Sequence, residues 1–106
     1  MELMSLVALT CQKRVLESLV DEMTDLLAVD RQASVVLYGL TRKEKDGFIL
    51  LGWHTNHIPG EFLRKLQTDE DVYDFAVFDP PYRWTLSDVA RTIERKEPNE
   101  HDEPRR

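Results

Sequence analysis

Two histidines are the side chains of this sequence best suited to metal or acid–base chemistry. His54 and His57 are three residues apart on an expected loop, and two imidazoles at that spacing can converge on one metal ion. No spacing in the sequence identifies further ligands, so we predict no metal site and no cofactor. Because imidazole titrates near neutral pH, the two histidines are instead candidates for acid–base or ligand contacts in a cleft that Tyr82 would also line.

The single cysteine is the other reactive group. Cys11 stands beside Lys13 and Arg14 at the expected start of a helix, where positive charge lowers a thiol pKa. A nucleophilic cysteine also needs an oriented base, and none lies nearby in the sequence. We therefore interpret Cys11 as a small buried apolar residue. The acidic pairs fall on polar faces or in loops, so we assign no catalytic residue.

A four-residue string, Asp79-Pro80-Pro81-Tyr82, directly follows the apolar segment VYDFAVF. It resembles the DPPY motif of amino-directed methyltransferases, in which the acid and the prolines hold the target amino group and the aromatic ring stacks on the base. Those enzymes also carry a glycine-rich cofactor loop after an earlier strand, and this sequence has no comparable loop. We therefore interpret the prolines as the end of a strand, since neither can donate a backbone hydrogen bond to a sheet.

Large aromatic side chains near loops are candidates for contact with a partner. Tyr38 and Trp53 fall on an expected hairpin, and Tyr82 and Trp84 follow the strand that ends at the prolines. The full set of partner- or ligand-binding candidates is Tyr38, Trp53, His54, His57, Tyr82 and Trp84.

Hydrophobic periodicity predicts the elements that position these side chains. Residues 3–9 are apolar on both faces of an extended chain, which favours a buried central strand. If they were helical, they would extend the next helix, because Met4, Ala8 and Cys11 share one helical stripe. Residues 11–30 carry apolar side chains at the spacing of one helical face and predict an amphipathic helix with an acidic outer face.

A β-hairpin is expected next. Residues 34–41 and 48–54 are rich in β-branched and aromatic side chains, and RKEKDG joins them. Asp46-Gly47 would supply the positive backbone angles of a tight turn. A four-residue loop would place Tyr38 opposite Trp53 and Gly39 opposite Gly52, whereas a two-residue loop would place Leu40 opposite Trp53.

Three further elements complete the folded part. Pro59 marks the first turn of a short helix that ends near residue 69, and residues 72–79 form a strand in which Asp74 discourages edge pairing. Thr85 or Ser87 caps a third helix that reaches Ile93. Residues 1–93 are thus expected to form a single domain, and the charged residues 94–106 a disordered tail.

These elements predict an α+β fold, an antiparallel sheet in the order β-α-β-β-α-β followed by an extra C-terminal helix. Two successive strand-helix-strand halves would make the first and third strands the inner ones. The order resembles that of ferredoxin-like domains, which include the small-molecule-sensing ACT modules. In those modules a ligand lies near the turn from the first strand to the first helix, which is commonly marked by glycine, and residues 10–13 contain none. If residues 3–9 were helical, the order would be α-β-β-α-β-α.

The composition of the chain argues against two classes of function, nucleic-acid binding and membrane association. The chain of 106 residues is 42% apolar, enough for one modest core. Its 20 acidic and 14 basic side chains give a net charge of -6, which argues against nucleic-acid binding. The longest apolar run falls far short of the roughly 20 residues that cross a bilayer, and Glu2 replaces the cationic start of a secretory signal. We predict a cytoplasmic domain that does not bind membranes.

The expected function is a non-enzymatic protein-interaction or regulatory module that forms a homodimer or recruits a protein partner. An open sheet edge would make such association favourable. One alternative is a small ligand-binding protein or enzyme with a cleft near His54, His57 and Tyr82. The second alternative is an acidic inhibitor that imitates nucleic acid and binds a basic protein.

Overall fold

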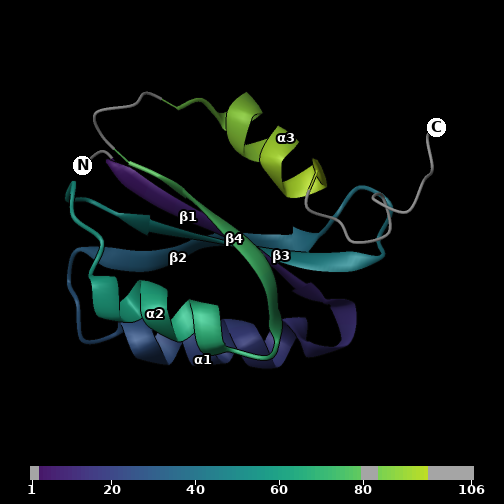
Figure 1. Cartoon of the computed structure of the whole chain (residues 1–106), viewed down its shortest axis with the longest axis horizontal. Coiled ribbons are helices and arrows are strands. Elements are labelled where there is room, and N and C mark those ends of the chain that lie inside the picture. The colour runs from purple at the N-terminus through teal and green to yellow at the C-terminus, as the bar shows by residue number, and fades with distance from the viewer. Residues whose placement is uncertain (1–2, 80–83, 96–106) are drawn as a thin grey trace.

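The computed structural model describes residues 3–79 and 84–95. Within them, four strands form one antiparallel sheet and three α-helices cover its faces (Figure 1). The elements in chain order are β1 (Ser5–Gln12), a 3-10 turn (Lys13–Val15), α1 (Leu16–Leu27), β2 (Ala33–Leu40), β3 (Asp46–Trp53), α2 (Gly60–Thr68), β4 (Val72–Phe78) and α3 (Leu86–Arg95). None of the helices in this described part has the length and apolar character needed to span a bilayer.

The first strand lies inside the sheet, as its two-sided apolar pattern predicts. Every residue of β1 except Gln12 is buried, because β3 and β4 flank it and helices cover both of its faces. The strand prediction is confirmed for residues 5–9, whereas residues 3 and 4 precede the strand, and the alternative of one long N-terminal helix is wrong. Pairing of Thr10 with Phe48 and of Cys11 with Gly47 extends β1 past residue 9. The helix α1 therefore begins at Leu16 rather than at Cys11.

The strand order across the sheet is β2-β3-β1-β4, and each neighbouring pair is antiparallel. The first and third strands are the inner ones, as predicted. The two edges belong to β2 and β4. Asp74, which is exposed, lies on the edge strand β4.

The hairpin of β2 and β3 forms, but the predicted turn and both predicted registers are wrong. Asp46 and Gly47 are the first residues of β3, and among the described non-glycine residues only Glu44 has a positive φ, of 57°. Leu40 lies opposite Gly47, and Tyr38 lies opposite Ile49. The backbone N–H of Thr41 donates to the carbonyl of Asp46 at 2.9 Å, so the loop lies at residues 42–45, before the Asp46-Gly47 pair that was expected to form the turn.

Gly47 serves close packing rather than turn formation. A Cβ on this residue would lie 3.0 Å from Leu16 Cδ1 and 3.2 Å from Cys11 Sγ. The lack of a side chain therefore lets the start of β3 approach β1 and the start of α1.

Two hydrophobic cores lie on opposite faces of the sheet. The larger one is enclosed by α1 and α2, and its buried members are Val7, Leu9, Cys11, Leu16, Leu19, Val20, Met23, Leu27, Ile49, Leu51, Trp53, Ile58, Phe62 and Leu66. The smaller one lies under α3 and contains Leu6, Ala8, Leu50, Val89 and Ile93. Alternate residues of β1 thus enter different cores, which explains why its sequence is apolar throughout.

Reciprocal capping starts α3 at Thr85, one of the two predicted cap residues. Thr85 Oγ1 accepts a hydrogen bond from the N–H of Asp88 at 3.1 Å, and Asp88 Oδ2 accepts one from the N–H of Thr85 at 3.0 Å. The helix runs to Arg95. Glu94, placed in the tail by the sequence prediction, accepts a hydrogen bond from the N–H of Arg42 at 3.1 Å. Residues 96–106 lie outside the described residues.

Candidate functional site

The candidate residues from the sequence are distributed over several parts of the fold. Tyr38 lies on the edge strand β2, whereas Trp53 ends the inner strand β3 opposite Ala33. His54 and His57 belong to the segment between β3 and α2. Tyr82 and the prolines of the DPPY string lie outside the described residues, so the proposed cleft with the histidines stays a prediction.

Hydrogen bonds to backbone carbonyls hold the histidine segment. The N–H of His54 donates to the carbonyl of Gln32 at 2.8 Å, and Thr55 Oγ1 donates to the carbonyl of His57 at 3.2 Å. Ser5 Oγ also donates to the carbonyl of Thr55, at 3.0 Å. No three His, Cys, Asp or Glu side chains within residues 3–79 and 84–95 are placed to hold a metal ion together.

Trp84 has a structural position beside the smaller core. Its Nε1–H donates to the carbonyl of Met4 at 3.4 Å, and its ring packs against the apolar residues under α3. This contact ties the segment before α3 to the start of β1.

Cys11 lies within β1 in the larger core rather than at a helix start, because the strand continues past it. Burial raises the pKa of its thiol from 9.0 to about 11, with smaller contributions from the negative charges of Asp46 and Asp71. A thiol with so high a pKa is a poor nucleophile at neutral pH. Its interpretation as a small buried apolar residue agrees with this environment.

Asp46 is a buried acid that the sequence reasoning missed, because Asp-Gly suggested an exposed turn. The residue is 4% exposed, and its Oδ2 has no hydrogen-bond partner. Burial raises the pKa of this carboxyl, and the positive charge of Lys45 partly opposes the effect. Little in the sequence indicates that Asp46 is buried, since only the pairing of β3 with β1 places this residue within the sheet.

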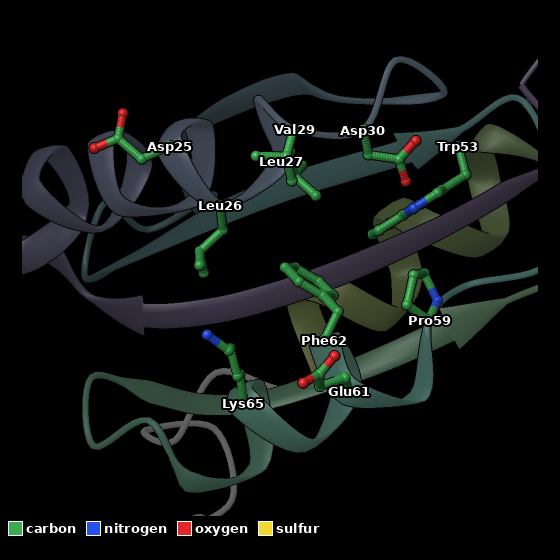
Figure 2. Close-up of a pocket in the computed structure, with 10 residues that line it drawn as sticks. All are labelled: Asp25, Leu26, Leu27, Val29, Asp30, Trp53, Pro59, Glu61, Phe62 and Lys65. Atoms are coloured by element: carbon green, nitrogen blue, oxygen red, sulfur yellow. The ribbon is translucent and has the colours of Figure 1, made fainter.

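A pocket of about 410 Å³ opens between the end of α1 and the beginning of α2 (Figure 2). Its apolar lining comes from Leu26, Leu27, Val29, Trp53, Pro59 and Phe62. Four charged residues complete the lining: Asp25, Asp30, Glu61 and Lys65. Of the sequence candidates that the structure describes, Trp53 is the one that lines this pocket. The remaining lining residues were not predicted from the sequence, because residues of α1 and α2 meet here only through packing on a common sheet face.

The indole of Trp53 forms the inner wall of the pocket. It is 1% exposed and meets Phe62 edge to face, with ring centroids 5.3 Å apart and planes at 66°. In Figure 2 the indole extends from β3 toward Phe62, between Asp30 and Pro59. Its Nε1 is buried and has no hydrogen-bond partner in the described structure. Buried indole nitrogens are normally hydrogen-bonded, so this donor distinguishes the pocket from ordinary core packing.

The exposed edge of the sheet is a second candidate surface. Four apolar side chains on β2 are accessible to solvent: Val36, Leu37, Tyr38 and Leu40. The strand sequence ASVVLYGL has no charged residue and no proline. We refer to these four residues as the β2 edge. No family model matches the chain, and the searches of curated proteins and of solved structures found nothing significantly similar to it.

Proposed function

We propose that the chain is a non-enzymatic interaction module that forms a homodimer by pairing the β2 edge with the same edge of a second copy. The observation that carries this proposal is an outer strand of eight residues without charge or proline. An edge strand presents unpaired backbone N–H and C=O groups, which readily accept another strand.

The two edges of the sheet differ in the features that prevent such pairing. β4 carries the exposed Asp74, and a charge on an edge disfavours the approach of another strand. On β2 the accessible side chains other than Ser34 are the apolar ones of the β2 edge, and Leu37 is 54% exposed. Association would remove these side chains from water and satisfy the outward backbone groups at the same time. The difference supports β2 as the interface.

The irregularity in β2 makes the edge self-complementary. The register with β3 shifts between Val35 and Leu37, so Val36 is an extra residue of β2. Val36 lies close to the position of a Cβ on Gly52, and Leu37 lies opposite Leu50, so both belong to the α3 face. A twofold axis between Val36 and Leu37 would place each opposite the other residue of the second copy, on one face of a continuous sheet.

On the same register, Val35 lies opposite Tyr38 of the second copy. Both residues pair with members of the larger core, Leu51 and Ile49, and therefore share the face covered by α1 and α2. Aromatic and β-branched residues form favourable cross-strand pairs. In this register, paired residues of the two copies lie on the same face of the sheet, both on the α3 face and on the face covered by α1 and α2. This agreement supports an isologous dimer rather than an open-ended assembly.

We also infer that the domain has the ferredoxin-like topology. The order β2-β3-β1-β4, the antiparallel pairing and the position of α1 and α2 on one face support this assignment. Helix α3 would then be an addition that covers the opposite face. The assignment carries no function by itself, because this fold serves unrelated activities.

The oligomeric state tests the proposed function. Sedimentation velocity from low micromolar to near-millimolar protein is expected to show a reversible monomer–dimer equilibrium. Leu37→Lys places an ammonium near the twofold axis and is expected to give a monomer throughout. Leu86→Lys is the matched control, because the same change falls on a side chain that is 73% exposed on α3, and it should dimerise like the wild type.

Two results would refute the proposal. One is a wild-type protein that stays monomeric at the highest concentration. The other is a Leu37→Lys variant that dimerises as strongly as the wild type and Leu86→Lys. Amide exchange adds an independent measurement, since dimerisation should slow exchange in β2 with rising concentration and leave β4 unchanged.

A further inference from the structure

We infer that the pocket between α1 and α2 binds a small amphipathic cation, an arylalkyl ammonium compound that also carries a hydrogen-bond acceptor. The assignment combines three features of the pocket: its apolar walls, the excess of acidic groups around them, and the unpartnered Nε1–H of Trp53. It goes beyond self-association, and no residue of β2 lines the pocket.

The size and walls of the pocket suit a small organic molecule. Its volume of about 410 Å³ falls in the range of sites that enclose such ligands. Phe62 and Trp53 meet edge to face and form an aromatic corner, and Leu26 belongs to the facing helix α1. A flat ring can insert between these groups with apolar contact on both sides, which favours an aryl rather than a highly polar ligand.

The charges of the lining favour a cation. Three acidic residues, Asp25, Asp30 and Glu61, belong to the lining, against the single ammonium of Lys65. The C-terminal end of α1 contributes in the same sense, because its last turn contains no basic residue to compensate the negative end of the helix dipole. An anionic ligand would meet repulsion from the same groups. The aromatic corner adds attraction for an ammonium group near the ring faces.

The indole of Trp53 supplies the specific polar contact. Its Nε1–H is buried and lacks an acceptor within the described residues. Because this nitrogen is closed to solvent, a ligand oxygen would satisfy the donor once neighbouring side chains shift to admit it, and a purely hydrocarbon ligand would leave it unsatisfied. We therefore expect the ligand to combine an ammonium group with a hydroxyl or carbonyl oxygen on its apolar body.

Three para-alkylphenols that differ in the charge of the side chain test the charge preference. Tyramine carries an ammonium group and a phenol oxygen, 4-ethylphenol is neutral, and 3-(4-hydroxyphenyl)propanoate is an anion of similar shape. Binding is measured from the indole N–H resonances of ¹⁵N-labelled full-length protein. Tyramine is expected to shift the Trp53 signal saturably. Trp84 is an internal control, because its Nε1–H donates to Met4 on the other face of the sheet, and its signal should stay in place.

Glu61→Gln tests the role of the acidic lining without disturbing the core, since Glu61 is exposed in the first turn of α2. We expect tyramine binding to weaken by about two- to fivefold, the size of one exposed charge interaction. Glu17→Gln is the matched control, because Glu17 is exposed in the first turn of α1 and does not line the pocket. It should bind tyramine like the wild type.

The inference is overturned if tyramine gives no saturable shift of Trp53, or if the propanoate binds as tightly as tyramine. It is also overturned if Glu61→Gln and Glu17→Gln bind alike, or if the Trp84 signal moves as far as that of Trp53. The monomeric Leu37→Lys variant should bind tyramine with wild-type affinity, so this result and the oligomeric state are independent of each other.

Discussion

Gly52→Ala is expected to destabilise the domain, because the central strand β3 has no space for a side chain at this position. Gly52 pairs with Leu6 on one side and with Ser34 on the other. An added Cβ would lie 2.7 Å from Val36 Cγ2 and 2.8 Å from Leu3 Cδ2. The leucine can move away by rotation, but Val36 has a β-branched side chain with little rotational freedom.

The net magnitude follows from two opposing effects. Overpacking of a closely filled site costs about 1–3 kcal/mol. Replacement of glycine by alanine restricts the unfolded chain and stabilises by about 0.4–1 kcal/mol. We therefore expect the free energy of unfolding to fall by about 1–2 kcal/mol. Gly60→Ala is the matched control, because no atom lies within 4 Å of its added Cβ, and it should be neutral or slightly stabilising.

Urea denaturation followed by far-ultraviolet circular dichroism measures both variants. A double-mutant cycle with Val36→Ala identifies the contact, since removal of Val36 Cγ2 should recover about 1 kcal/mol of the loss at Gly52. The reasoning is refuted if Gly52→Ala is as stable as Gly60→Ala. It is equally refuted if the effects of Gly52→Ala and Val36→Ala are additive, because the clash would then lie elsewhere.

Four further predictions concern α3 and the buried groups near β1. Thr85→Ala removes one half of the reciprocal cap and should lower stability by about 1 kcal/mol, with faster amide exchange at Val89 and Ile93; unchanged exchange would contradict the role of the cap. Cys11 should react with iodoacetamide only as fast as the protein unfolds, and equal rates in the native and urea-unfolded protein would contradict its burial. Because folding raises the Cys11 pKa from 9.0 to about 11, the contribution of the protonated thiol to the free energy of unfolding is intact below pH 9 and is lost as pH rises through 11. In urea titrations this loss should reach roughly 3 kcal/mol, and it should be absent from Cys11→Ala. For Asp46, whose pKa burial also raises, stability relative to Asp46→Asn should be greatest under acid conditions and should decrease as pH rises through the folded-state pKa of the carboxyl; an equal response of both proteins in urea titrations at pH 4 and pH 7 would contradict this.

Local sequence determined most of the elements and their faces. Apolar residues on both sides of residues 3–9 require cover on two faces, which only an inner strand of this sheet receives. Pro59 and Thr85 mark the beginnings of α2 and α3 because the restricted φ of proline and the hydroxyl of threonine act within one helical turn. These interactions involve near neighbours in the chain and can be inferred from spacing.

The hairpin shows where local inference fails. Asp46-Gly47 has the composition of a turn, yet the packing of Gly47 against Leu16 and Cys11 places both residues inside β3. That contact joins segments that are remote in sequence, so no window of a few residues contains it. The same packing buries Asp46 and shifts the register by which Tyr38 and Trp53 were expected to meet.

The candidate sites depend on tertiary structure to a greater extent than the secondary-structure elements do. The sequence identified Tyr38 and Trp53 as aromatic residues of interest, but only the strand order makes Tyr38 an edge residue and Trp53 a wall of the pocket. Periodicity states which face of a helix or strand is apolar. It does not state which side chains of α1 and α2 will converge over the sheet, because that depends on distances between elements that are far apart along the chain.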